Sequence, residues 1–165
     1  PGSSTDTGFF RYTNTTAVSF SIAASLVELG CNSAYINKVM FETKSKEKIM
    51  LEREVYDTIT YCADGKCAIV WVTLDMLKSL NIGEDEIEGL ASIPRQIEGV
   101  LIGITMKEKE GGFFKISVRT NGDIDAAKFC SKFGGGGHKA AAGCSINGSL
   151  EDVRSQLIKA AEETL

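Results

Sequence analysis

The chain has 165 residues, of which 43% are hydrophobic and 24% are charged, and its formal net charge is −4. This composition is typical of a globular protein with enough residues for one good core, and no apolar run approaches the ~20 residues that a transmembrane helix needs. The acidic balance argues against a protein that coats long nucleic acid through a broad basic face, although a small anion site remains compatible with it.

Helices are predicted to dominate the first sixty residues. The polar start, PGSSTDTG, has neither the basic nor the apolar region of a signal peptide, so we expect a cytoplasmic protein without a membrane partner. In residues 15–29 apolar side chains recur at helical spacing, and Gly30 provides a stop signal. Residues 33–61 are predicted to continue as helix, with the charged stretch TKSKEK as a solvated break.

From Cys67 onwards, predicted strands alternate with helices. CAIVWVTL forms a strand, short helices follow in DMLKSLNIG and EDEIEGLASIPRQI, and two strands, GVLIGITMKE and FFKISVRTN, are joined by a hairpin-like turn. A helix over DIDAAKFCSKF ends at a glycine run, AAGCSI is a further strand, and an amphipathic helix capped by Ser149 ends the chain. This order predicts an α/β (α+β) domain with a mixed β-sheet flanked by helices, preceded by a helical connector.

The five cysteines, Cys31, Cys62, Cys67, Cys130 and Cys144, are irregularly spaced. Cys62 and Cys67 flank the turn ADGK, which would let them face each other across a hairpin. A zinc site would need four ligands at short paired spacings, and the chain has one histidine. We therefore expect reduced, mostly buried thiols.

The most unusual stretch is KFGGGGHKAAAGCSI, residues 132–146, in which four glycines precede His138. Backbone N–H groups of glycine can approach a ligand closely, and N–H groups curled in a turn suit phosphate oxygens. If HKAAA begins a helical turn, its free N–H groups add to that site, with His138 and Lys139 at the rim. One glycine is enough to end the preceding helix, and each further one costs backbone entropy. We therefore interpret the run as a phosphate cradle, with simple helix termination as the alternative.

A second polar pattern lies in KISVRT, residues 115–120. In a strand, Lys115, Ser117 and Arg119 point to one face, and the two apolar residues between them point to the other. Such a row can hold phosphate and base edges, because arginine binds phosphate bidentately. A sheet with one wet face is the common alternative.

These residues resemble a known family. GGGHKAAAG, residues 135–143, resembles the GGGH-x-x-A-A-G signature of the C-terminal, DHH-associated domain of the DHH phosphoesterases. KISVRT resembles the strand that precedes that signature, and TDTGFFRYTNTT, residues 5–16, resembles the last motif of the DHH catalytic domain. The chain is most similar to the bacterial nanoRNase and pAp-phosphatase branch, the bifunctional oligoribonucleases.

The resemblance implies two lobes joined by a linker helix. Residues 1–30 would end the DHH catalytic domain, residues 31–62 would form the linker helix, and residues 63–165 would form the substrate-binding domain. It also implies two divalent ions, usually Mn²⁺, and short RNA oligonucleotides or nucleotides as partners. Asp6 is similar to the family's final metal ligand. The implied substrate-binding residues are Ser117, Arg119, Gly134, Gly135, Gly136, Gly137, His138 and Lys139, with Arg95 as a weaker candidate that surface acids could pair instead.

The chain departs from the family in its metal-binding residues. It has no Asp-His-His triplet, and one aspartate cannot hold the two ions that activate water and steady the leaving oxygen. We therefore expect a fragment that is inactive by itself. Its parent would be a manganese-dependent phosphoesterase that hydrolyses short oligoribonucleotides and pAp. A homodimer is one oligomeric state that this parent could adopt. Two alternatives remain open: a phosphodiesterase of cyclic or linear dinucleotides in the same superfamily, and a non-catalytic RNA-binding module.

Overall fold

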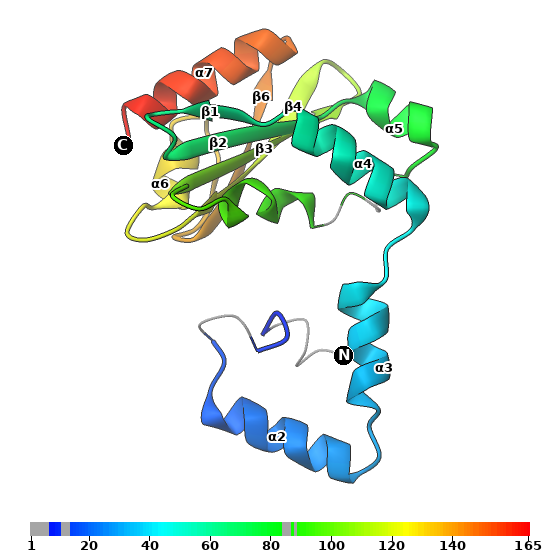
Figure 1. The fold of residues 1–165 in the computed structure, drawn as a ribbon. Helices are drawn as coiled ribbons and strands as arrows, with labels where there is room; N and C mark the ends of the chain where they lie inside the picture. Colours follow the sequence, from blue (N-terminus) through cyan, green and yellow to red (C-terminus); the bar gives the residue numbers. More distant parts are fainter. Residues whose placement is uncertain (1–6, 11–13, 84–86, 88) are drawn as a thin grey trace. The chain divides into compact units, whose positions relative to one another are not determined.

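The computed structural model describes residues 7–10, 14–83, 87 and 89–165. The chain separates into two compact units, Pro1–Ser45 (unit 1) and Lys46–Leu165 (unit 2). Unit 2 contains both the glycine run and the KISVRT strand, and it is a sheet covered by helices (Figure 1).

The sheet of unit 2 has six strands among the described residues, in the order β1-β2-β3-β4-β6-β5. Strands β2 and β3 are parallel, and the other neighbouring pairs are antiparallel. This mixed sheet confirms the fold class that the sequence predicts. The strands are β1 (Thr60–Cys62), β2 (Cys67–Val72), β3 (Ile102–Lys109), β4 (Phe113–Thr120), β5 (Gly136–His138) and β6 (Ala141–Asn147).

Helices pack on both faces of this sheet. Helices α6 and α7 contribute to a core on one face, while α4 and α5 contribute to a core on the other. The short helix predicted over EDEIEGLASIPRQI contains, in its described part, two 3₁₀ turns. The elements are α4 (Lys46–Asp57), α5 (Leu74–Leu80), η3 (Leu90–Ser92), η4 (Pro94–Gln96), α6 (Ala126–Ser131) and α7 (Leu150–Glu162).

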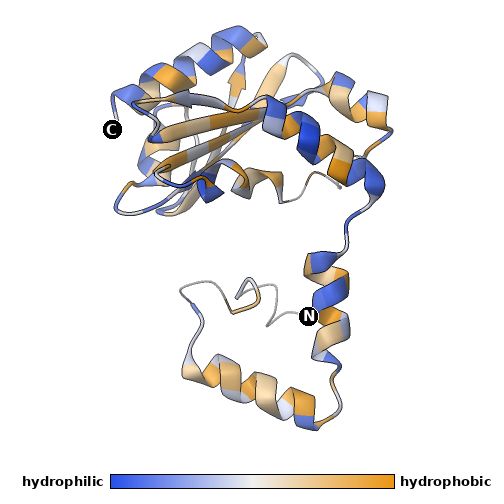
Figure 2. Ribbon diagram, viewed as in Figure 1, coloured by the Kyte–Doolittle hydropathy of each residue, from blue (hydrophilic) through white to orange (hydrophobic). Residues whose placement is uncertain are grey.

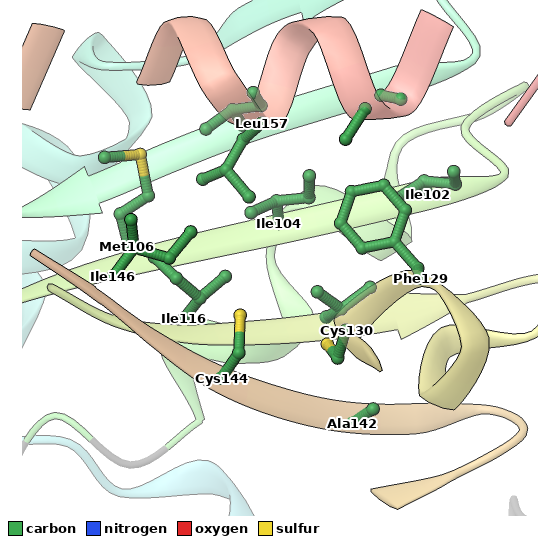
Figure 3. Close-up of a cluster of buried hydrophobic side chains, with 14 of the residues drawn as sticks. Ile102, Ile104, Met106, Ile116, Phe129, Cys130, Ala142, Cys144, Ile146 and Leu157 are labelled. Carbon is green, nitrogen blue, oxygen red and sulfur yellow. The ribbon is translucent and has the colours of Figure 1, made fainter. Parts of the chain in front are cut away.

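The larger core lies between the sheet and helices α6 and α7 (Figure 3). Ile104 and Met106 of β3 and Ile116 of β4 point into it, where they meet Phe129 of α6 and Leu157 of α7. None of these five side chains is more than 1% exposed. Burying a side chain of this size stabilises a fold by about 1.5–3 kcal/mol, so this layer fixes the positions of β3, β4 and β6.

The smaller core lies on the opposite face and covers only part of it. Leu51 and Val55 of α4 pack there with Val70 of β2 and Leu90 of η3. Its buried members include no residue of β4, β5 or β6. These three strands therefore present, on this face, side chains that the smaller core does not bury.

Strand β1 lies where the sequence predicts helix. The predicted helix over residues 33–61 is divided into α3 (Ser33–Asn37), a π-helical turn (Lys38–Glu42) and α4. After α4 come Thr58, Ile59 and Thr60, whose β-branched side chains favour an extended chain. The Thr58 hydroxyl also accepts the Trp71 N–H at 3.1 Å, which ties the segment to β2. Pairing with β2 therefore overrides the helical pattern.

Unit 1 contains helices without a buried side chain. Helix α2 (Ala17–Glu28) begins at Thr16, whose hydroxyl accepts the Ser19 N–H in a capping box, and none of its residues is buried. Figure 2 shows that α2 is largely hydrophobic along its length. No single described helix is long and apolar enough to span a membrane, whereas α2 and Ser33–Glu42 meet the length and composition criterion only as a pair bent by 117°.

Candidate functional site

Strand β4 presents a row of polar side chains on the face that the smaller core leaves uncovered. Ile116 and Val118 are buried in the larger core, whereas Lys115 is exposed and Ser117 and Arg119 are half-buried. This alternation confirms the prediction that the three polar side chains share one face. We call the surface that β4, β5 and β6 form on this side the open face.

The strand register places Arg119 and His138 in one line across three strands. Ala141 of β6 pairs with Arg119 of β4 on one side and with His138 of β5 on the other. Directly opposed residues of antiparallel strands have their side chains on the same face. Because neighbouring strands lie about 4.8 Å apart, the two backbones are about 10 Å apart, with only a methyl group between them. A guanidinium and an imidazole therefore flank a shallow gap.

A second row beside the first has almost no side chains. Gly143 of β6 pairs with Ser117 of β4 and with Gly136 of β5. The row continues to Thr105 of β3, where η3 covers it and the buried Thr105 hydroxyl lies 3.5 Å from the Leu90 carbonyl oxygen. The floor of the open face therefore consists of bare backbone with one hydroxyl, bounded on one side by the 3₁₀ turns.

The four glycines of the run do not share one role. Gly134 adopts φ +71° in the turn that follows α6, and a Cβ on Gly135 would collide with the Gly143 carbonyl oxygen and with the Cys144 Cβ at 2.5 Å. Gly137 has φ +152° and would place a Cβ 2.6 Å from Ala142 Cα. Only Gly136 has open space where a Cβ would lie and a φ outside the left-handed region. Of the four glycines, Gly136 is therefore the one that neither packing nor backbone conformation requires.

The helical turn considered for HKAAA does not form. His138 ends β5 and Ala141 begins β6, so the segment is a β-hairpin rather than a helix start. Ala142 and Cys144 alternate into the larger core, and this packing outweighs the helix propensity of the alanines. An anion site on this hairpin would therefore use side chains and extended backbone instead of the free N–H groups of a helical turn in HKAAA.

Lys139 lies in the hairpin turn and is held by its neighbours. Its ammonium is 3.5 Å from an Asp123 carboxylate oxygen, and both side chains are exposed, so the pair contributes little stability. Its carbonyl oxygen accepts the Ala126 N–H at 2.7 Å and the Thr120 hydroxyl at 3.1 Å. The backbone of the turn is therefore fixed, and the Lys139 side chain lies at the end of the open face.

The backbone of Arg95 lies against the sheet next to Arg119. Gly103, the β3 partner of Arg119, would place a Cβ 2.7 Å from the Arg95 nitrogen, so only glycine allows this approach. The Asn121 side-chain amide donates hydrogen bonds to the carbonyl oxygens of Arg95 at 3.2 Å and Val100 at 2.8 Å. These contacts bring a second arginine to the border of the open face.

Two thiols lie behind the glycine run, on the core side of the sheet (Figure 3). The Gly135 N–H donates to the Cys130 carbonyl oxygen at 3.0 Å. A hydrogen bond from the Cys130 thiol lowers the pKa of Cys144, and burial opposes this shift. The same hydrogen bond and burial raise the pKa of Cys130, against the effect of the Arg119 charge. All five cysteines are free, and Cys67, Cys130 and Cys144 are buried, so the prediction of mostly buried thiols holds for these three.

Two residues in or beside the open face lie outside the set predicted from the sequence. Gly143 is one of them, although the alternation of AAGCSI places it with Ala141 and Ser145 opposite the buried residues of β6. Asn121 gave no signal, because its role depends on the distant Arg95 and Val100 carbonyls. Asp6, the predicted metal ligand, lies outside the described residues. Within the described ranges, no three His, Cys, Asp or Glu side chains gather in a way that could hold a metal.

The open face can bind a ligand that carries an anionic group next to a flat ring. Lys115, Arg119 and His138 supply donors along one face of an otherwise acidic protein, and Ser117 adds a hydroxyl. Arginine binds phosphate through two parallel hydrogen bonds. The bare floor at Gly136 and Gly143 leaves room for a sugar or base to lie on the sheet.

Comparison with known protein families finds a match over most of unit 2. The sequence profile described as "DHHA1 domain" matches residues 64–165. This range contains the KISVRT strand and the glycine–histidine signature, residues 115–120 and 135–143. It therefore includes every residue of the open face.

Similar proteins share nearly the whole length of this chain. A bifunctional oligoribonuclease and PAP phosphatase, NrnA, of Thermus thermophilus is 30% identical over 98% of this chain and 48% of its own length. NrnA of Bacillus subtilis is 25% identical over 86% of this chain and 44% of its own. The crystal structure of an exopolyphosphatase-related protein from Bacteroides fragilis superimposes with a TM-score of 0.86, at 24% identity, over 97% of this chain and 48% of the other. The chain thus spans about half the length of the curated relatives it matches.

Proposed function

Because the chain belongs to the DHHA1 domain family, as its glycine–histidine signature indicates, we propose that the open face binds a short oligoribonucleotide or a nucleotide such as pAp. The observation that carries this proposal is the line of Arg119 and His138 beside the side-chain-free row of Gly136 and Gly143. The names of the curated relatives, bifunctional oligoribonucleases and PAP phosphatases, support this class of ligand.

Each group on the open face has a distinct part in this proposal. Arg119 binds a phosphate bidentately, and His138 donates to the same phosphate or its neighbour. Ser117 donates a hydrogen bond, while Gly136 and Gly143 let the sugar or base approach the backbone. Arg95 stands at the border, where a second phosphate would lie.

In the parent enzyme, we propose hydrolysis of the phosphoester at two Mn²⁺ ions. The described residues do not fit such a metal site, because no three potential ligands gather among them. No reaction step is therefore assigned to a residue of this chain. We propose that the chain binds substrate but does not cleave it without further metal-binding residues.

The experiment is calorimetric titration of this chain, without metal, with a 5′-phosphorylated diribonucleotide and with pAp. Arg119→Ala and His138→Ala should each weaken binding, Arg119→Ala by about 10- to 100-fold, because a hydrogen bond to a charged group is worth about 1.5–3 kcal/mol. With Mn²⁺ added, the pure chain should leave the ligand uncleaved. Cleavage that depends on Mn²⁺ would contradict the assignment of this chain to binding alone.

Arg154→Ala is the matched control, because Arg154 is an arginine of α7 that contacts Trp71 and Glu151 instead of the open face. It should leave the affinity unchanged. A cyclic dinucleotide that binds more tightly than pAp would favour the dinucleotide alternative. A steep loss of affinity with salt would favour an extended RNA-binding module, since a site for one or two phosphates releases few counterions.

A further inference from the structure

The hairpin of β1 and β2 places two cysteines opposite each other at the edge of the sheet. Cys62 and Cys67 are direct partners in the antiparallel ladder. Their side chains therefore share one face of the sheet, the face of the larger core. The two thiols are close enough that each shifts the pKa of the other, lowering that of Cys62 and raising that of Cys67. This places two sulfur atoms side by side at the end of a ladder, next to the turn.

The turn between them keeps the two thiols together. Ala63, Asp64 and Gly65 all have positive φ, at 51°, 54° and 80°. The Gly65 N–H donates to the Cys62 carbonyl oxygen at 3.2 Å, and the Lys66 N–H donates to the Ala63 carbonyl oxygen at 3.0 Å. Left-handed residues at the centre of a hairpin turn give the twist that brings the flanking residues directly opposite each other.

One thiol of the pair is accessible and the other is not. Cys62 is half-buried, whereas Cys67 is fully buried. The hydrogen bond from the Cys67 thiol lowers the pKa of Cys62, while burial and the Glu162 carboxylate oppose this shift. In the second thiol pair, Cys130 and Cys144, both residues are buried. A reagent from solvent therefore reaches the pair at the hairpin first.

We propose that Cys62 and Cys67 form a reversible thiol–disulfide site whose substrate is a hydroperoxide. The Cys62 thiolate attacks a peroxide oxygen, so that an S–O bond forms, the O–O bond breaks, and hydroxide leaves and takes up a proton. The Cys67 sulfur then attacks the Cys62 sulfur, forming the S–S bond, and the S–O bond breaks with loss of water. Two thiols are oxidised by two electrons, and hydrogen peroxide is reduced to two waters.

The disulfide would lock the edge hairpin without touching the open face. The open face is formed by β4, β5 and β6, whereas the cysteine pair lies on β1 and β2 and points to the opposite side of the sheet. The site is therefore independent of nucleotide binding. Oxidation should leave the affinity of the open face unchanged.

The test is oxidation of the reduced full chain with hydrogen peroxide, followed by alkylation in denaturant and tryptic mass spectrometry. Trypsin cleaves after Arg53, Lys66 and Lys78, so Cys62 and Cys67 fall in two separate peptides. The expected product is this peptide pair joined by a disulfide, with Cys130 and Cys144 recovered as alkylated thiols. Treatment with dithiothreitol should return both peptides as thiols.

Cys62→Ser should abolish the crosslink and leave Cys67 as a thiol. Cys31→Ser is the matched control, because Cys31 is the other half-buried thiol, and it should leave the crosslink intact. The proposal is overturned if Cys62 and Cys67 are both recovered as alkylated thiols while other cysteines oxidise. It is also overturned if Cys62 accumulates as a sulfinic acid without joining Cys67.

Discussion

Helix α2 of unit 1 is the more apolar of two helices that differ in burial, yet α7 of unit 2 is the one that buries its apolar side chains. In unit 2, α7 buries Val153, Leu157, Ala160 and Ala161 against the sheet. In unit 1, α2 buries no residue, and Leu29 at its end is 84% exposed. Unit 2 therefore buries its apolar residues, whereas in unit 1 none of the α2 residues is buried, although the Phe20 ring stacks on Phe10.

This difference separates residues whose identity the packing of the fold explains from residues whose identity it does not explain. A buried side chain such as Leu157 has a structural reason to be apolar. An exposed apolar row, or a glycine that neither packing nor φ requires, needs another reason. The comparison can be tested by making the same substitution in both settings.

The largest contrast should come from two leucines. Leu157→Ala removes a fully buried side chain from the larger core and should lower the free energy of unfolding by about 2–5 kcal/mol. Leu29→Ala removes an exposed side chain and should change it by no more than about 0.5 kcal/mol. Urea unfolding followed by circular dichroism measures both. A comparable loss for Leu29→Ala would show that the apolar side chains of unit 1 are covered in solution.

Two adjacent glycines sharpen the comparison within unit 2. An alanine at Gly135 meets the Cys144 Cβ at 2.5 Å, and such overpacking should cost about 1–3 kcal/mol. An alanine at Gly136 meets nothing within 4 Å and should leave stability unchanged or raise it by up to about 1 kcal/mol.

Thermal unfolding of Gly135→Ala and Gly136→Ala, together with nucleotide titration of each folded variant, separates packing from binding. Gly136→Ala should weaken nucleotide binding although the fold is intact, because its methyl group enters the bare floor of the open face. A Gly136→Ala variant that binds as tightly as the parent chain would remove that floor from the site.

The sequence predicted the part of the site that depends on local alternation. Lys115, Ser117 and Arg119 could be placed on one face because a strand alternates every second residue. The pairing of His138 with Ala141, and so with the Arg119 row, could not be predicted, because it depends on a hairpin where the alanines favour helix.

Long-range contacts explain the other differences. The predicted helix runs through residue 61, yet residues 60–62 pair with β2 once the turn at residues 63–66 brings the two segments together. The approach of Arg95 to Gly103 is likewise invisible in the sequence, since it requires the turn at η4 to fold back over β3. Local patterns therefore predict most of the helices and strands and the polar side chains of β4. The position of His138 and Arg95 beside them depends on tertiary packing.

The smallest contrast concerns two helix caps. The hydroxyl groups of Ser149 and Thr16 accept N–H groups at the starts of α7 and α2. Ser149→Ala should lower the free energy of unfolding by about 1 kcal/mol, because α7 is part of the larger core and its fraying disrupts that core. Thr16→Ala should reduce the far-ultraviolet helical signal of α2. It should leave the unfolding midpoint of unit 2 unchanged, because α2 has no buried residue whose loss of packing would destabilise a core. If Thr16→Ala shifts that midpoint as much as Ser149→Ala does, the two units unfold as one cooperative body.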